Sequence, residues 1–225
     1  MSGPDTRPTA AAPRGIFRAG SLATGRVEAF SDGVFAIVVT LLVLELHVPQ
    51  VQAEALPRAL LELLPRFLSY ALSFAVIIVW WVAHHQFFAV VRRTDRGLLW
   101  LNSLFLLWLT FVPFPTAMLG EFYRERVAVA FYGASLALVG VSFFLMRWYA
   151  SRGASLLNED IDARLVAQSL RRGALSPLLY ACGALAALAS TDVALVIYAA
   201  IPVLYFLPGH LERHGAARNT DETGL

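Results

Sequence analysis

The sequence is poor in charged residues, in cysteine and in lysine. Only 15% of its 225 residues are charged, and all 18 of its basic residues are arginines. Because about a quarter of the residues in an average soluble domain are charged, this composition argues against a soluble protein. The single cysteine, Cys182, lies in an apolar stretch. One cysteine excludes an intramolecular disulfide and a disulfide-stabilised ectodomain.

Motifs for several kinds of chemistry are also missing. The chain contains no Walker loop, no G-x-G-x-x-G, no H-E-x-x-H and no T-V-G-Y-G-like selectivity filter. Its net charge of +2 gives no indication of a nucleic-acid partner. We therefore predict no enzymatic activity, no cofactor and no nucleic-acid binding.

Apolar residues are abundant instead. They make up 58% of the chain, with a mean hydropathy of +0.62. A helix that crosses a bilayer needs about 20 mostly apolar residues. We count six such windows, at residues 27–48, 67–91, 98–119, 127–149, 176–190 and 193–207. The sequence thus predicts an all-α membrane protein with a six-helix transmembrane domain over 26–208, a disordered cytoplasmic tail over 1–25 and a second cytoplasmic tail over 209–225.

The last two windows are short, and local signals suggest where they begin. Ser176 and Pro177 are expected to serve as the N-cap and first helical residue of the fifth span. Thr191 or Asp192 is expected to cap the sixth. The segment 158–172 carries apolar residues on one helical face. It therefore predicts an interfacial amphipathic helix or, equally well, a solvated linker helix.

The arginines indicate the orientation of the spans in the membrane, and two prolines indicate where the third span is interrupted. Fourteen of the 18 arginines fall in the two tails and in the connections that six spans place on the same side. The positive-inside rule makes that side cytoplasmic, together with both termini. Pro113 and Pro115 are expected to kink or end the third span, because proline lacks the N–H that continues a helix.

Polar residues in three windows fall at one depth. Asp32, His85 and Asn102 each lie six or seven residues from an arginine at the cytoplasmic end of their window. At about 1.5 Å per residue, all three lie about 9 to 10 Å inside the membrane interface. We expect a hydrogen-bonded network that ties spans one to three together, formed by Ser31, Asp32, the Trp80/Trp81 pair, His84 or His85, and Asn102. The alternative is a set of unrelated polar side chains that reach towards the headgroups.

The first window has two different faces. Ile37, Leu41 and Leu44 lie within about 60° of one another on a helical wheel, and Asp32 lies about 140° from Ile37. We expect the acid to face spans two and three and the aliphatic stripe to face elsewhere. Such a stripe on a membrane helix usually faces lipid or packs on a neighbour, so its periodicity does not by itself indicate a pore.

The segment RVEAFSDGVFAIVVTLLVLEL (26–46) resembles the first helix of the transmembrane protein 175 family of potassium-permeable channels. The family signature is Arg, three residues, then Phe-Ser-Asp, which here is Arg26, Phe30, Ser31 and Asp32. WWVAHHQFF in the second window and LWLNSLFLLWLTFVPFP in the third also resemble its members. The resemblance extends over residues 26–207.

The resemblance implies a homotetramer in the plasma membrane of a prokaryote, with four copies of the first helix lining a pore for potassium and other monovalent cations. The constriction would consist of aliphatic side chains, here Ile37, Leu41 and Leu44. Thr40 corresponds to a hydroxyl layer that is linked to selectivity in some members. A narrow aliphatic ring blocks ions by dewetting and conducts when it widens. Arg26, at the cytoplasmic entrance, would stack on Phe30, pair with a neighbouring chain or act only as a topological anchor.

Two other functions remain open at this point. Asp32 and the histidines would form a proton relay in a proton-coupled secondary transporter. His84 or His85 would instead ligate haem in an electron-transfer bundle.

Overall fold

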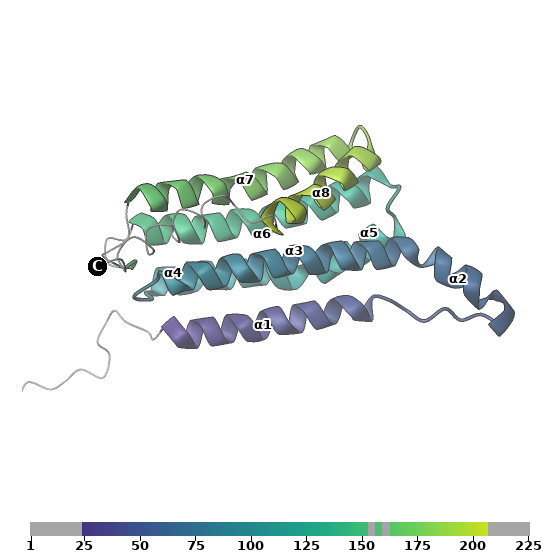
Figure 1. Ribbon diagram of the computed structural model, residues 1–225, viewed down its shortest axis with the longest axis horizontal. Helices are drawn as coiled ribbons and strands as arrows, with labels where there is room; N and C mark the ends of the chain where they lie inside the picture. The colour runs from purple at the N-terminus through teal and green to yellow at the C-terminus, as the bar shows by residue number, and fades with distance from the viewer. Residues whose placement is uncertain (1–23, 153–155, 159–162, 207–225) are drawn as a thin grey trace, which may run out of the picture.

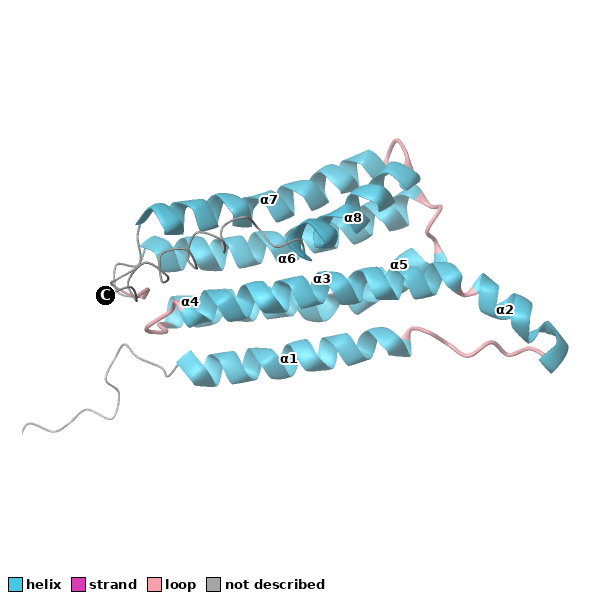
Figure 2. Cartoon of the chain, in the orientation of Figure 1, coloured by secondary structure: helices cyan, strands magenta, loops and turns pink. Residues whose placement is uncertain are grey.

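The computed structural model describes residues 24–152, 156–158 and 163–206. The long helices form a bundle whose axes run in similar directions (Figure 1), and an extended loop after the first helix leads to a short helix that projects at one end (Figure 2). The one β pairing in this part of the chain is an isolated bridge between Val91 and Leu157. The prediction of an all-α protein is therefore confirmed.

The helices follow the predicted windows closely over the first four spans. In chain order they are α1 (Thr24–Leu44), the short 3-10 helix η1 (Ala53–Ala55), α2 (Leu56–Glu62), α3 (Leu64–Ala89), α4 (Arg96–Phe111), α5 (Pro113–Glu121), α6 (Arg126–Arg152), α7 (Ala163–Ala187) and α8 (Thr191–Phe206). Proline occupies the first turn of α2, α3 and α5, where its missing N–H costs no hydrogen bond. Of the predicted tails, 1–23 and 209–225 lie outside the described residues.

Four helical stretches among the described residues are long and apolar enough to cross a membrane: α1, α3, α4 together with α5, and α6. The helices in the fifth and sixth windows fall short of this for different reasons. The first half of α7 carries three arginines, and α8 has only 16 residues. Six spans therefore stay a prediction.

The fifth window begins differently from the prediction. α7 is continuous from Ala163 to Ala187, with Pro177 inside it. Among the described residues no separate helix precedes it, and Ser176 and Pro177 do not start a helix. Gly140 of α6 lies against the buried Pro177, so that a Cβ added to this glycine would lie 3.1 Å from the proline Cβ. Close packing along α6 keeps α7 helical through a proline that costs an isolated helix about 3 kcal/mol.

Two further local predictions can be compared with the structure. The third span is interrupted as expected, because α4 ends at Phe111 and α5 begins at Pro113. The cap of α8 is different from the expected Thr191 or Asp192. The Val193 N–H donates to Ser190 Oγ at 3.4 Å, so the residue before Thr191 takes this role.

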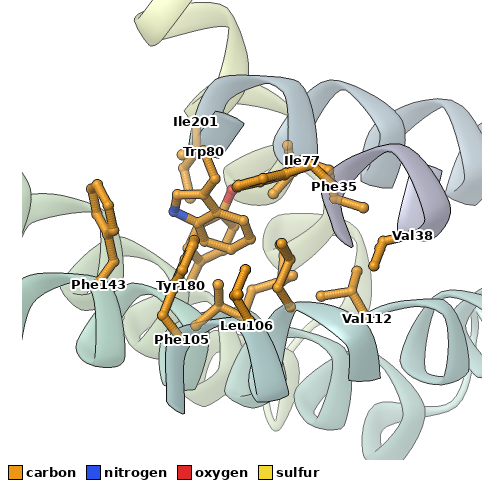
Figure 3. Packing of buried hydrophobic residues seen from close by; sticks show 14 of the residues in the cluster. Phe35, Val38, Ile77, Trp80, Phe105, Leu106, Val112, Phe143, Tyr180 and Ile201 are labelled. Carbon is orange, nitrogen blue, oxygen red and sulfur yellow. The ribbon is translucent and has the colours of Figure 1, made fainter. Parts of the chain in front are cut away.

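Apolar side chains from α1 and from α3 to α8 meet in one core. Figure 3 shows Phe35 of α1, Trp80 of α3, Phe105 of α4 and Tyr180 of α7 among them. α1 packs on α3, α4 and α5. α7 and α8 lie on the side of the bundle away from α1 (Figure 1). α1 is therefore an outer helix of the monomer.

Candidate functional site

α1 is packed along one face only. Its buried residues recur every three or four positions: Val27, Ser31, Phe35, Val38 and Leu42. This spacing forms one stripe along an α-helix, and the stripe faces the neighbouring helices of the bundle. The opposite face of α1 has no neighbour within the described chain.

A buried chain of hydrogen bonds connects α1, α3 and α4. Asn102 Nδ2 donates to Ser31 Oγ at 3.0 Å, and the Ser31 hydroxyl donates to the Val27 carbonyl at 2.8 Å. Asn102 Oδ1 lies 3.0 Å from His84 Nε2. Because an amide oxygen can only accept, His84 Nε2 is the donor in this arrangement. Ser31, His84 and Asn102 are all buried. Their polar atoms therefore depend on one another for hydrogen bonds, because water does not reach them.

Aromatic rings enclose the other side of His84. The rings of Phe35, Phe88, Phe105 and Phe143 lie with their centroids 4.6 to 6.4 Å from that of His84. Its Nδ1 has no hydrogen-bond partner among the described residues. The histidine is thus held through a single nitrogen.

A second set of contacts lies nearer the surface between α1 and α3. Trp81 Nε1 donates to Asp32 Oδ1 at 3.0 Å. His85 Nδ1 lies 3.2 Å from Glu28 Oε1, and the His85 ring stacks on that of Trp81. The two contacts between α1 and α3 lie one helical turn apart. Glu28 precedes Asp32 by four residues on α1, and Trp81 precedes His85 by four on α3.

The structure therefore divides the residues of the expected network into two sets. Ser31, His84 and Asn102 form one, and Asp32 joins the other through Trp81. Trp80 belongs to neither set, because its ring packs in the core 5.9 Å from that of Tyr180. Sequence reasoning missed Glu28, although its position one turn before Asp32 on the same face was a usable signal.

The expected gate residues lie on the uncovered face of α1. Ile37, Leu41 and Leu44 are 59%, 41% and 67% exposed. Thr40 is also exposed, and its hydroxyl donates to the Ile37 carbonyl at 2.8 Å, so that its oxygen can still accept a hydrogen bond. The stripe from Ile37 to Leu44 extends about 10 Å along the helix.

The motif residues before the stripe are divided between the faces. Arg26 and Phe30 are exposed, and Phe30 is 65% accessible. Ser31 is buried, and Asp32 is partly buried. Consecutive residues on a helix differ by about 100° in direction, so the motif supplies both the anchored and the uncovered face. The described residues contain no group of three or more His, Cys, Asp or Glu side chains that could hold a metal ion.

Comparison with known proteins places the chain in a family. The family model described as "Endosomal/lysosomal potassium channel TMEM175" matches residues 26–113. The chain is 42% identical over 163 residues to a potassium channel of Chamaesiphon minutus, covering 70% of this chain and 80% of that protein. It is 38% identical over 187 residues to a potassium channel of Streptomyces collinus, covering 81% and 91%. The chain belongs to the TMEM175 family.

A solved TMEM175 structure agrees with the fold. The crystal structure of a "lysosomal potassium-selective channel TMEM175 homolog" from Chamaesiphon minutus matches with a TM-score of 0.75 and 36% sequence identity, over 82% of this chain and 96% of that chain. The TMEM175 family match ends at Pro113 and so contains α1, α3 and α4, which hold both contact sets and the uncovered stripe. Membership in this channel family, together with its apolar helices, makes the chain a membrane protein.

Proposed function

We propose that the chain is a potassium-permeable cation channel that assembles as a homotetramer around four copies of α1. The observation that carries the proposal is the uncovered aliphatic stripe of Ile37, Leu41 and Leu44 on a helix whose other face is packed. A single chain cannot enclose a pore with one helix. Four copies related by a central axis would cover one another's stripes.

In such an assembly the stripe would form stacked rings of aliphatic side chains. A ring narrow enough to exclude water blocks ions, and a small widening restores hydration and conduction. Thr40 would add a ring of hydroxyl oxygens within the same helical turn as Ile37. Arg26 and Phe30 would line the entrance at the other end of the uncovered face.

The two contact sets would fix the direction of the stripe. Asn102 holds Ser31 from the packed side of α1, and Trp81 holds Asp32 one residue further on. These bonds attach α1 to α3 and α4 near the end of the helix that carries Arg26. A bundle of six spans with both termini in the cytoplasm of a prokaryotic cell would put this end at the cytoplasmic side.

Proton-coupled transport is not favoured. The relatives described above bear the names of channels. In the structure Asp32 bonds to Trp81, while His84 bonds to Asn102, so the acid and the buried histidine do not form consecutive members of one relay. A haem site at His84 is not supported either, because four phenylalanine rings surround it and its Nε2 is already bonded.

Current through the purified full-length protein in a planar lipid bilayer, with potassium chloride solution on both sides, tests the proposal. We expect single-channel steps, and we expect Ile37→Asn to raise the conductance or change the selectivity, because a polar ring stays wet. Leu178→Asn is the matched control, since Leu178 is 61% exposed and belongs to α7, which lies on the side of the bundle away from α1 (Figure 1). A native mass measurement should give four subunits. A folded tetramer that passes no current would refute the proposal.

A further inference from the structure

A cavity of about 420 Å³ opens between α3, α6, α7 and the end of α8. Three of these helices are long and α8 is short. α3, α6 and α7 have 26, 27 and 25 residues, whereas α8 has 16 and ends at Phe206. Of the described residues of α8, Tyr205 beside its last residue lines the cavity.

Arg147 of α6 is the cation of this cavity. Its Nη2 donates to the Ser169 carbonyl at 3.0 Å and also contacts Ser169 Oγ. Its guanidinium carbon lies 5.6 Å from the centre of the Phe143 ring. These contacts fix the plane of the guanidinium, while Nη1 and Nε have no hydrogen-bond acceptor among the described residues.

Among the described residues, no carboxylate pairs with the charge of Arg147. No aspartate or glutamate is among the described residues that line the cavity, and no described acidic side chain forms an ion pair with Arg147. The polar lining comes instead from amides and hydroxyls: Gln86, Gln168, Ser169, Ser176 and Tyr205. A partly buried cation in a membrane protein is stabilised by an anion or by water, so this cavity favours an anionic ligand.

The charged part of the lining lies nearer one end of the bundle. Arg147 lies five residues before the end of α6 at Arg152, which is about 7.5 Å along the helix and within headgroup depth. Gly140 of α6 and Val79 of α3 line the cavity about two turns deeper. A ligand that fits both parts carries an anionic group at one end and a hydrocarbon chain at the other.

We propose that this cavity binds an anionic phospholipid, with its phosphate on Arg147 and the start of an acyl chain along Val79 and Gly140. Guanidinium groups bind phosphate oxygens through pairs of parallel hydrogen bonds, and Nη1 and Nε of Arg147 have no acceptor among the described residues. Basic pockets between membrane helices bind the headgroups of anionic phospholipids. The described residues that line the cavity come from α3, α6, α7 and α8 and none from α1, so the site is separate from the proposed pore.

Lipid binding to the full-length protein in detergent, measured by native mass spectrometry, tests the proposal. The probes are phosphatidylglycerol, phosphatidylcholine of the same chain length and inorganic phosphate. We expect Arg147→Gln to raise the dissociation constant for phosphatidylglycerol about tenfold or more, as the loss of a charge-assisted pair should. The control Arg152→Gln removes an exposed cation that lies over the Trp148 ring at the end of the same helix, and should change this constant less than twofold.

A second variant blocks the cavity and leaves the charge in place. A Cβ at Gly173 would lie 3.6 Å from Arg147 Nη1, an ordinary contact, and Gly173→Leu would extend further into the cavity. We expect this variant to lose phosphatidylglycerol as well. Unchanged binding in both Arg147→Gln and Gly173→Leu overturns the proposal. Phosphatidylcholine bound as tightly as phosphatidylglycerol, or inorganic phosphate that displaces the lipid at equal concentration, overturns the assignment to an anionic phospholipid.

Discussion

Replacing Asn102 with leucine tests whether the buried chain of hydrogen bonds holds α1 in place. Asn102 is the central member, because it donates to Ser31 of α1 and its oxygen lies 3.0 Å from His84 Nε2 of α3. Leucine has a similar size, so Asn102→Leu removes both bonds without opening a large cavity. Ser31 keeps its bond to the Val27 carbonyl. His84 loses its one partner and stays enclosed by phenylalanine rings.

The cost has two parts. A buried polar group left without a partner costs about 1 to 3 kcal/mol, and this applies to His84. The lost bond between Asn102 and Ser31 adds about 0.6 kcal/mol, the average for a hydrogen bond between membrane helices. We therefore expect Asn102→Leu to lower the free energy of unfolding by about 1.6 to 3.6 kcal/mol. Ser103→Leu, at an exposed neighbouring position of α4, should change it by less than about 0.5 kcal/mol.

A double-mutant cycle separates this explanation from a loss of packing. His84→Phe alone leaves the Asn102 oxygen unpaired, whereas His84→Phe combined with Asn102→Leu leaves neither group behind. We expect the double variant to lose about as much stability as either single one, with a coupling of about 1 kcal/mol or more. Unfolding of the purified protein in mixed micelles, followed by intrinsic fluorescence, measures all four states. Single effects that add within about 0.5 kcal/mol would show that Asn102 and His84 do not act together.

Two further substitutions test contacts elsewhere in the bundle. Trp81→Phe removes the donor to Asp32 and should lower the free energy of unfolding by about 1 kcal/mol. Asp32→Asn keeps an acceptor and should lower it by less than half as much. Equal losses of the two variants on unfolding in micelles would contradict this. Gly133→Ala would put its Cβ 2.6 Å from Tyr198 Cζ and should lower the free energy of unfolding by about 1 to 3 kcal/mol. In the control Gly25→Ala, the added Cβ enters open space. Similar melting temperatures for the two variants would refute the reasoning.

Depth along a helix was easier to predict from sequence than the identity of a contact. Counting residues from the flanking arginines placed Asp32, His85 and Asn102 at one level, and their three helices do meet there. Direction around each helix depends on how the helices pack, and sequence does not give this. Asp32 therefore has Trp81 as its partner, and the partner of Asn102 is the other histidine, His84.

The fold beyond the fourth span shows a similar limit. Hydropathy located the apolar half of α7 but not its beginning, because residues 163–175 include several arginines and precede a proline. The long contact with α6 keeps this part helical, and Gly140 makes room for Pro177. Pair contacts of this kind are tertiary, so a single sequence read along its length does not reveal them.

The packed and uncovered faces of α1 also constrain how a gate on this helix would open. Side-chain tips lie about 5 to 6 Å from a helix axis, so a rotation of about 40° would withdraw Ile37 from a central axis by only about 1.4 Å. The same rotation would move Ser31 Oγ by about 2 to 3 Å, enough to break its bond of 3.0 Å with Asn102. A constriction at Ile37 that widens by rotation of α1 alone would therefore cost this buried bond. Opening is less costly if α1 moves together with α3 and α4, because Ser31, His84 and Asn102 then stay paired while the four stripes separate.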